Sequence, residues 1–153
     1  MVGDYVMIQH NADGRRSAPD PVALGRYTID SHGVQRLASG NLARWEGSIG
    51  GTVPYPYGIS YRSLIPRAGE CENVLCTFAL SASHVGFASA RMEPVFMITS
   101  QSAATAAAMA MDHQVAVQQV DYPGLSARLR AAGQILAWET AAAVSLNSSS
   151  DQR

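Results

Sequence analysis

The sequence from Ser81 to Pro94 reads SASHVGFASARMEP and stands between two segments of different character. Before it, Asn73–Leu80 is a nearly continuous apolar run, which is typical of a strand covered on both faces. After it, an alanine-rich segment continues to about Met111, and Pro94 suits the first turn of a helix. The pattern predicts a buried strand, a loop of small residues at 81–90 and a long helix from Pro94.

This junction is the best physical candidate for a functional site. Free backbone N–H groups and the positive end of the helix dipole would point at whatever lies above the start of the helix. Such an end favours a phosphate, a carboxylate or an anionic ring such as a reduced flavin. His84 adds a titratable group, and Arg91 adds a permanent cation. The alternative is purely structural: Arg91 and Glu93 pair with each other, and His84 satisfies backbone groups.

The remaining segments predict shorter elements. Short alternating runs bounded by turn residues indicate strands upstream, and a second helix ended by Gly133 is expected downstream. Strands are expected at Tyr5–Gln9, Gly25–His32 and Ile59–Ile65, turns with short strands at 39–58, and the helix at Gly124–Ala132. The tail after Ala143 is expected to be disordered. The predicted fold class is α/β, or α+β for an isolated fragment.

The composition excludes several classes of function. With 153 residues, 47% apolar and 15% charged, the chain is globular, and its net charge of −1 argues against nucleic acid or an anionic membrane as partner. All eleven basic residues are arginines, so Schiff-base chemistry, a catalytic lysine and a P-loop are excluded. Val95–Met111 is too polar for a membrane span, and the start shows no secretory signal, which predicts a cytoplasmic location.

Other chemistries have weaker support in the sequence. Asp30 and His32 lie two residues apart on one face of a predicted strand, where they could act as a base and its orienting group or form a solvated strand end. Ser83 precedes His84 without a GxSxG motif, which argues against a serine hydrolase. None of the four histidines has the i, i+4 spacing of a zinc site, and the two cysteines match no redox or zinc motif.

Several spaced motifs form one further pattern along the chain. They are DSHGVQR at 30–36, YGISYRSLIP at 57–66, ENVLC at 72–76, LSASH at 80–84, RMEP at 91–94, QSAATAAA at 101–108 and GQIL at 133–136. In this order they resemble FAD-dependent oxidoreductases of the large glutathione-reductase-like flavoprotein superfamily, in particular the group called xanthan lyase-like. The resemblance covers roughly residues 24–136. It departs at Ser100 and Thr105, where the family often has glycines, and larger side chains reduce close approach to a cofactor.

The resemblance implies the C-terminal part of such a flavoprotein. The GxGxxG unit that holds the ADP half of FAD does not occur in this sequence, so a missing N-terminal FAD-binding half is the expected partner. By this resemblance, residues 1–62 end a substrate-facing β region, 63–112 return into a Rossmann-like FAD-binding domain, 113–140 form a helical segment and 141–153 form the tail. The residues that it places near the cofactor are Ser81, Ser83, Arg91, Met92, Glu93 and Gln101.

The expected function is removal of a hydride from a C–H bond of a small-molecule substrate, with FAD as acceptor. His84 is the first candidate for a proton-accepting or substrate-orienting role, His32 is the second, and Arg91 is the candidate for charge stabilisation near the flavin. The isolated chain is expected to bind FAD weakly or not at all. The alternatives are a non-catalytic remnant or interaction module that folds with a separately encoded N-terminal half, and a hydrolase that uses Ser83 and His84.

Overall fold

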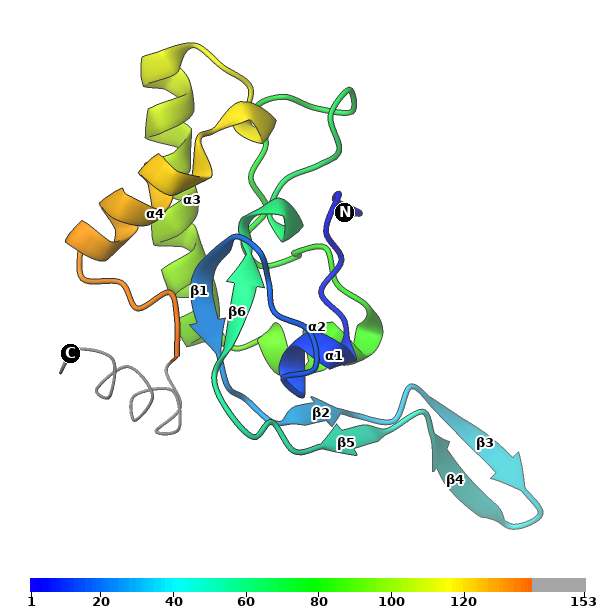
Figure 1. The fold of residues 1–153 in the computed structure, drawn as a ribbon. Coiled ribbons are helices and arrows are strands. Elements are labelled where there is room, and N and C mark those ends of the chain that lie inside the picture. Colours follow the sequence, from blue (N-terminus) through cyan, green and yellow to red (C-terminus); the bar gives the residue numbers. More distant parts are fainter. Residues whose placement is uncertain (139–153) are drawn as a thin grey trace, which may run out of the picture.

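Strands in this chain form one long antiparallel ribbon, as seen in a computed structural model that describes residues 1–138. The ribbon turns back at Gly40, whose φ of 63° lies in the left-handed region that favours glycine. The strands pair from the outside inwards: β1 (Pro21–Gly25) with β6 (Tyr57–Ser60), β2 (Ile29–Ser31) with β5 (Ile49–Gly51), and β3 (Gln35–Ser39) with β4 (Leu42–Glu46). Figure 1 shows the ribbon running from the helices out to its tip.

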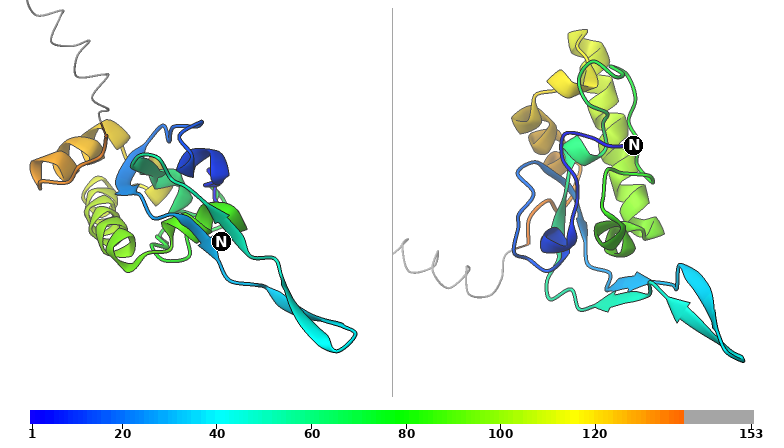
Figure 2. Two further views of the ribbon diagram at one scale, coloured as in Figure 1. Left: turned by 90° about the horizontal axis from the view of Figure 1, so that it is seen from below. Right: turned by 90° about the vertical axis from the view of Figure 1, so that its right-hand side faces the viewer.

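The two ends of this ribbon lie in different environments. At the base, Val22, Ala23 and Ile59 are fully buried in the hydrophobic core. At the tip, every residue of β3 and β4 is exposed. Residues 33–48 project away from the helices in both views of Figure 2, and this segment is called the arm below. The core therefore forms at the base of the ribbon, while the arm contributes nothing to it.

Helices cover the base of the ribbon. The α-helices are α1 (Gln9–Ala12), α2 (His84–Ala90), α3 (Glu93–His113) and α4 (Tyr122–Ala131), and short 3₁₀ turns occur at Tyr61–Ser63 and Val117–Gln119. The long helix predicted from Pro94 to Met111 is confirmed as α3. The second predicted helix is also confirmed as α4, which begins just after its N-cap Asp121 and is followed by Gly133 with φ 84°.

Small side chains allow α3 to pack closely on β1. Ser102 is fully buried, and its hydroxyl group donates a hydrogen bond to the Val22 carbonyl oxygen at 2.6 Å. Ala106 on the same helix is also fully buried. Leu125 and Leu129 of α4 have no exposed surface and complete this part of the core. Complete burial of a leucine side chain stabilises a fold by roughly 1.5–3 kcal/mol, so the two helices and β1 form one packed unit.

The predicted strand at Asn73–Leu80 is absent, and this prediction was wrong. The segment forms turns and irregular backbone, with Val74 44% and Phe78 65% exposed. An apolar run indicates that side chains favour burial, but it does not say what covers them. Within residues 1–138 no strand lies beside this segment to pair with it. Its backbone is held to the base of the ribbon instead, where the Cys76 N–H donates to the Leu64 carbonyl at 2.7 Å.

Within the predicted loop at 81–90, residues 84–90 form the helix α2 instead. Ser83 is the N-cap of α2, and its hydroxyl oxygen accepts a hydrogen bond from the Gly86 N–H at 3.1 Å. Gly86 is required at this point because a Cβ atom there would lie 2.5 Å from the Met7 carbonyl oxygen. Alanine and serine favour or tolerate a helix when one face is buried, and composition alone could not distinguish this from a loop.

Two other predicted strands are only partly present. Tyr5–Gln9 is reduced to a single parallel bridge between Met7 and Ala82, and α1 begins at Gln9. Ile59–Ile65 contains only the end of β6 before a 3₁₀ turn begins at Tyr61. The strand predicted at Gly25–His32 is also only partly present, since the range contains the last residue of β1 and the short strand β2.

The described residues mix helices and strands, as the predicted α/β or α+β class requires. All strand pairs among residues 1–138 are antiparallel, so the Rossmann-like part of the prediction stays a prediction, as do the boundaries at 62, 112 and 140. Among the described helices, none has the length and hydropathy that a bilayer crossing requires. The predicted disordered tail lies outside the described residues.

Candidate functional site

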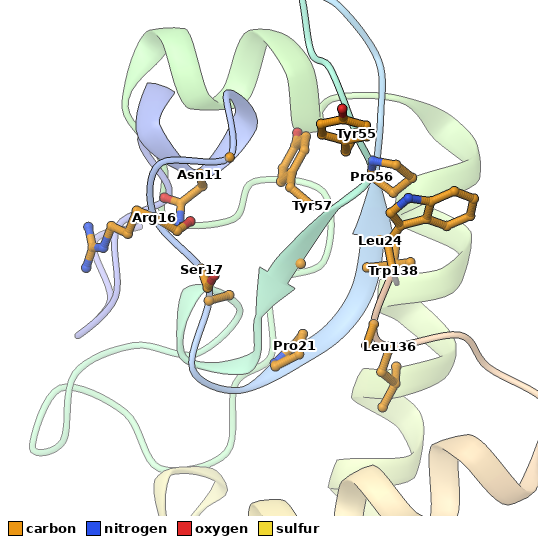
Figure 3. A pocket seen from close by; sticks show the side chains of 14 residues that line it. Asn11, Arg16, Ser17, Pro21, Leu24, Tyr55, Pro56, Tyr57, Leu136 and Trp138 are labelled. Atoms are coloured by element: carbon orange, nitrogen blue, oxygen red, sulfur yellow. The ribbon is translucent and has the colours of Figure 1, made fainter. Parts of the chain in front are cut away.

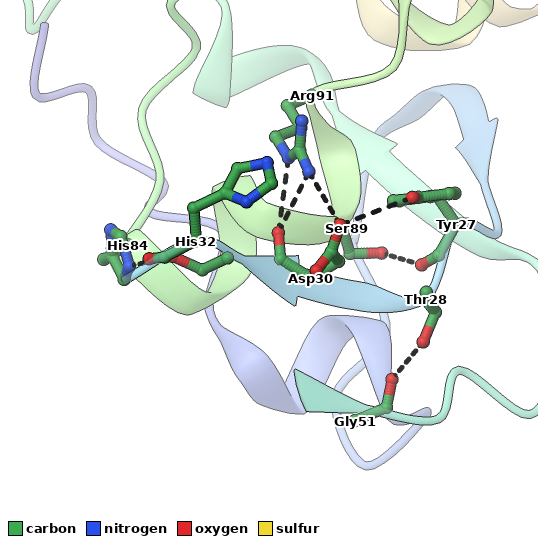
Figure 4. A network of polar contacts seen from close by, with 9 residues as sticks. Tyr27, Thr28, Asp30, His32, Gly51, His84, Ser89 and Arg91 are labelled. Carbon is green, nitrogen blue, oxygen red and sulfur yellow. Dashed lines mark hydrogen bonds and ion pairs between the residues drawn. The ribbon is translucent and has the colours of Figure 1, made fainter. Parts of the chain in front are cut away.

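A pocket of about 350 Å³ lies where β2 and the start of the arm meet α2. Asp30, Ser31 and His32 line it from the ribbon, and His84 and Arg91 line it from either end of α2. The apolar part of its lining comes from Val34, Phe87 and Ala88. Figure 4 shows how these two segments, more than fifty residues apart in the sequence, bring their polar side chains together.

Arg91 ties the end of α2 to β2. Its Nη2 atom lies 3.1 Å from Asp30 Oδ2 and 3.2 Å from the Asp30 carbonyl oxygen, and its Nε lies 3.3 Å from the same carbonyl. Its guanidinium carbon lies 5.8 Å from the centre of the Tyr27 ring. The ion pair is about one third to one half exposed, since the side chains are 34% and 45% exposed. The alternative pairing of Arg91 with Glu93 does not form.

His84 is held from the other side of the pocket. Its Nε2 atom lies 2.8 Å from the Ser31 hydroxyl oxygen, which also lies 3.2 Å from the His32 carbonyl oxygen. His84 is exposed, and it is the first residue of α2 because Ser83 caps the helix just before it. The hydroxyl group of Ser31 therefore fixes the orientation of the imidazole while leaving it accessible from solvent.

A buried hydrogen-bond chain supports this site from below. Tyr57 donates to Ser89 Oγ at 2.8 Å, and Ser89 in turn donates to the Tyr27 carbonyl oxygen. Both Tyr57 and Ser89 are buried, and burial raises the pKa of Tyr57 to about 12. A phenol with this pKa stays protonated at neutral pH and keeps donating. The chain thus joins β6, α2 and the segment before β2, as Figure 4 shows in part.

The N-terminus of α3 follows directly after Arg91. Met92 is its N-cap and supplies no side-chain hydrogen bond, and the first N–H that bonds back is that of Phe96, to the Met92 carbonyl at 3.0 Å. Pro94 has no N–H, so Glu93 and Val95 provide the free donors of the first turn. The exposed carboxylate of Glu93 complements the helix dipole and opposes binding of an anion at the same place.

The structure brings together only some of the predicted site residues. His84, His32 and Arg91 line one pocket, and Met92 and Glu93 are the next two residues of the chain. Three others lie apart from it. The hydroxyl oxygen of Ser83 caps α2. Ser81 is 1% exposed, and its hydroxyl group has no hydrogen-bond partner among the described residues. Gln101 is exposed on α3, eight residues and therefore about 12 Å beyond Glu93.

Sequence reasoning missed the partners of the two key side chains. The sequence pairs Asp30 only with His32 and gives no reason to single out Ser31, although Asp30 holds Arg91 and Ser31 holds His84. Pairing across β2 and α2 depends on the tertiary fold, and no local spacing encodes it. Residues 1–138 contain no group of three or more side chains that could hold a metal ion.

Two imidazoles and an arginine that is paired with Asp30 thus line one pocket. The family model of FAD dependent oxidoreductases matches residues 1–129, and the chain therefore belongs to this family. No curated protein and no solved structure matches the chain significantly. The resemblance seen in the motifs is thus confirmed at the level of the family.

The residues present fit one part of FAD. The uncapped first turn of α3 and the polar pocket beside it suit the electron-rich edge of a flavin ring, although Glu93 weakens this fit. The pyrophosphate has no matching cradle in residues 1–138, where no glycine-rich turn leads from a strand into a helix N-terminus. The glycines at 47–51 lie between β4 and β5 instead.

Proposed function

We propose that this chain supplies the flavin-facing part of an FAD-dependent oxidoreductase that removes a hydride from a small organic substrate. The observation that carries the proposal is the pocket in which His84, His32 and Arg91 meet directly before the N-terminus of α3. When bound, FAD accepts the hydride in enzymes of this kind.

His84 is the proposed proton acceptor. Loss of a hydride from a carbon that carries a hydroxyl or amino group also releases a proton from that group. The imidazole of His84 is exposed and its Nε2 atom is held by Ser31 at 2.8 Å, so Nδ1 is the atom that would accept the proton from a substrate in the pocket. His32, exposed on the same wall, orients the substrate.

Arg91 has a positioning role in this proposal. Because its guanidinium group is bound by Asp30, its positive charge is partly compensated, and it acts mainly by holding β2 against α2. The free N–H groups of α3 then provide the positive potential for the flavin. The ADP half of FAD is held by another unit, the N-terminal half that the resemblance implies, which is the proposed partner.

A non-catalytic interaction module is the second candidate. It is favoured by the apolar side chains that the arm exposes to solvent, which are Val34, Leu37, Leu42 and Trp45. Single exposed apolar residues are ordinary, but several on one projecting ribbon are typical of a contact surface. In this case the polar network of Asp30, Arg91, Ser31 and His84 only braces the ribbon.

Nuclear magnetic resonance of the full chain titrated with FMN separates these two candidates. FMN presents the flavin ring without the ADP half, and chemical shifts detect weak binding. The proposal expects amide shifts at Ser31, His32 and His84 and at Glu93 and Val95, and none at His113 at the far end of α3. His84→Ala should reduce these shifts, whereas the matched control His113→Ala should leave them unchanged. Absence of shifts around His84 would favour the interaction module.

A further inference from the structure

A second pocket, of about 440 Å³, lies beside Trp138 and shares no lining residue with the site at His84. Its walls are mainly apolar and come from β1, α3 and the segment after α4, through Leu24, Ile98, Ile135 and Trp138. Leu24 and Trp138 also line a neighbouring pocket of about 400 Å³, shown in Figure 3. A mainly apolar pocket of this volume lies within the range of small-molecule sites, about 300–1,000 Å³.

Gln134 ties one wall of this pocket to α3. Its side-chain amide lies 3.0 Å from Ser102 Oγ, whose single proton is donated to the Val22 carbonyl oxygen at 2.6 Å. The amide NH2 group of Gln134 is therefore the donor to Ser102 Oγ. Gln134 thus leaves the recognition of a charged ligand to Arg26.

Arg26 supplies the charge of the same pocket. It lines the pocket from the end of β1, it is exposed, and it forms no ion pair with any carboxylate of the part of the chain described. The pocket has no acidic residue in its lining. Apolar walls, an indole ring and one uncompensated cation thus meet at a single cavity.

We propose that this pocket binds a planar aromatic organic anion. The ring system lies against Trp138, Ile98 and Ile135, and the acid group pairs with Arg26. A neutral aromatic compound satisfies only the apolar walls, and a small inorganic anion satisfies only Arg26. Both halves of the ligand are therefore needed, and this specificity does not depend on flavin binding.

The chain permits a direct fluorescence test because it contains only two tryptophans, Trp45 and Trp138. In the Trp45→Phe variant, Trp138 is the sole indole donor of energy transfer to a bound probe. The probes are 1-anilinonaphthalene-8-sulfonate and N-phenyl-1-naphthylamine, which share the ring system and differ in the sulfonate. Saturable energy transfer to the sulfonate probe at one site per chain is expected.

A variant of Arg26 decides whether the binding is specific. Arg26→Ala should weaken binding of the sulfonate probe at least about fivefold and leave the neutral probe within about twofold, because only the sulfonate uses this group. The matched control Arg44→Ala, on the arm, should change the binding of neither probe. Arg26 is on the surface, so Arg26→Ala should not disturb the fold. Absence of saturable energy transfer, or equal loss for both probes in Arg26→Ala, would overturn the proposal.

Discussion

Ser83 shows how a single residue can carry a structural role at a position that the motifs place beside a cofactor. Its hydroxyl oxygen caps α2 through the Gly86 N–H, and no hydrogen bond joins it to the imidazole of His84, which is held by Ser31. This arrangement has no nucleophile paired with a base at Ser83, which removes the geometric support for the hydrolase alternative.

Replacing Ser83 by alanine should therefore affect stability. The loss of the cap is expected to lower the free energy of unfolding by about 1 kcal/mol, as for other N-caps. Ser39→Ala, on the exposed end of β3, is the matched control and should stay within about 0.5 kcal/mol of the native chain. Urea unfolding measures both. A fluorophosphonate probe should not label Ser83, and specific labelling would restore the hydrolase alternative.

Because of Tyr57, the free energy of unfolding should decrease as the pH rises in the alkaline range. Its pKa is raised to about 12 in the fold by burial, against 10.0 for an unperturbed tyrosine. The contribution is therefore fully present below pH 10 and is lost as the pH rises towards 12, since only the unfolded chain ionises in this window. Tyr57→Phe should reduce the fall in unfolding free energy between about pH 9 and about pH 11 by roughly 1 kcal/mol. If the unfolding free energy of Tyr57→Phe fell as much over this pH range as that of the native chain, this assignment would be wrong. Some pH dependence remains in the variant because burial also raises the pKa of Tyr61.

At the scale of elements, replacing leucine by alanine should lower the free energy of unfolding much more in the core than in the arm. Leu129 of α4 is fully buried, whereas Leu42 of β4 is 64% exposed. Leu129→Ala should cost about 2–5 kcal/mol through lost burial and the cavity that remains, and Leu42→Ala should stay within about 0.5 kcal/mol. Chemical denaturation of the two variants side by side checks this. A large loss for Leu42→Ala would mean that the arm packs against the body.

The elements also show where sequence reasoning succeeded. The helix α3 was predictable because alanine propensity, Pro94 in the first turn and the absence of helix breakers all agree. The conformation of Asn73–Leu80 was not predictable, because an apolar run cannot reveal whether a neighbouring strand exists. The pairing of the strands in the ribbon could not be predicted either. The turn residues at 39–58 indicated short strands, but the register of each strand is set by a partner distant in the sequence, as in the pair β1 and β6.

The sequence predicted which residues belong to the candidate site but not the hydrogen bonds that hold them. His84, His32 and Arg91 were suggested by residue type and motif, and they do line one pocket. The contacts that orient them, Ser31 with His84 and Asp30 with Arg91, join positions 53 and 61 residues apart. Only the fold places such positions side by side, so no spacing rule could have named these pairs.

At the scale of the whole molecule, the proposed function gives this chain one side of a flavin site. The match to FAD dependent oxidoreductases covers residues 1–129, and the pocket at His84 with the start of α3 suits the flavin ring. The described residues offer no cradle for the pyrophosphate. Affinity for flavins should therefore come from the ring alone, and the ADP half of FAD should add little.

Titration of the full chain with FAD and, in parallel, with FMN tests this claim most directly. The account predicts weak binding of both, with dissociation constants that agree within about threefold, since neither the second phosphate nor the adenosine meets the protein. A yellow, stoichiometric FAD complex that survives gel filtration, or an FAD affinity roughly 100-fold above that for FMN, would contradict it.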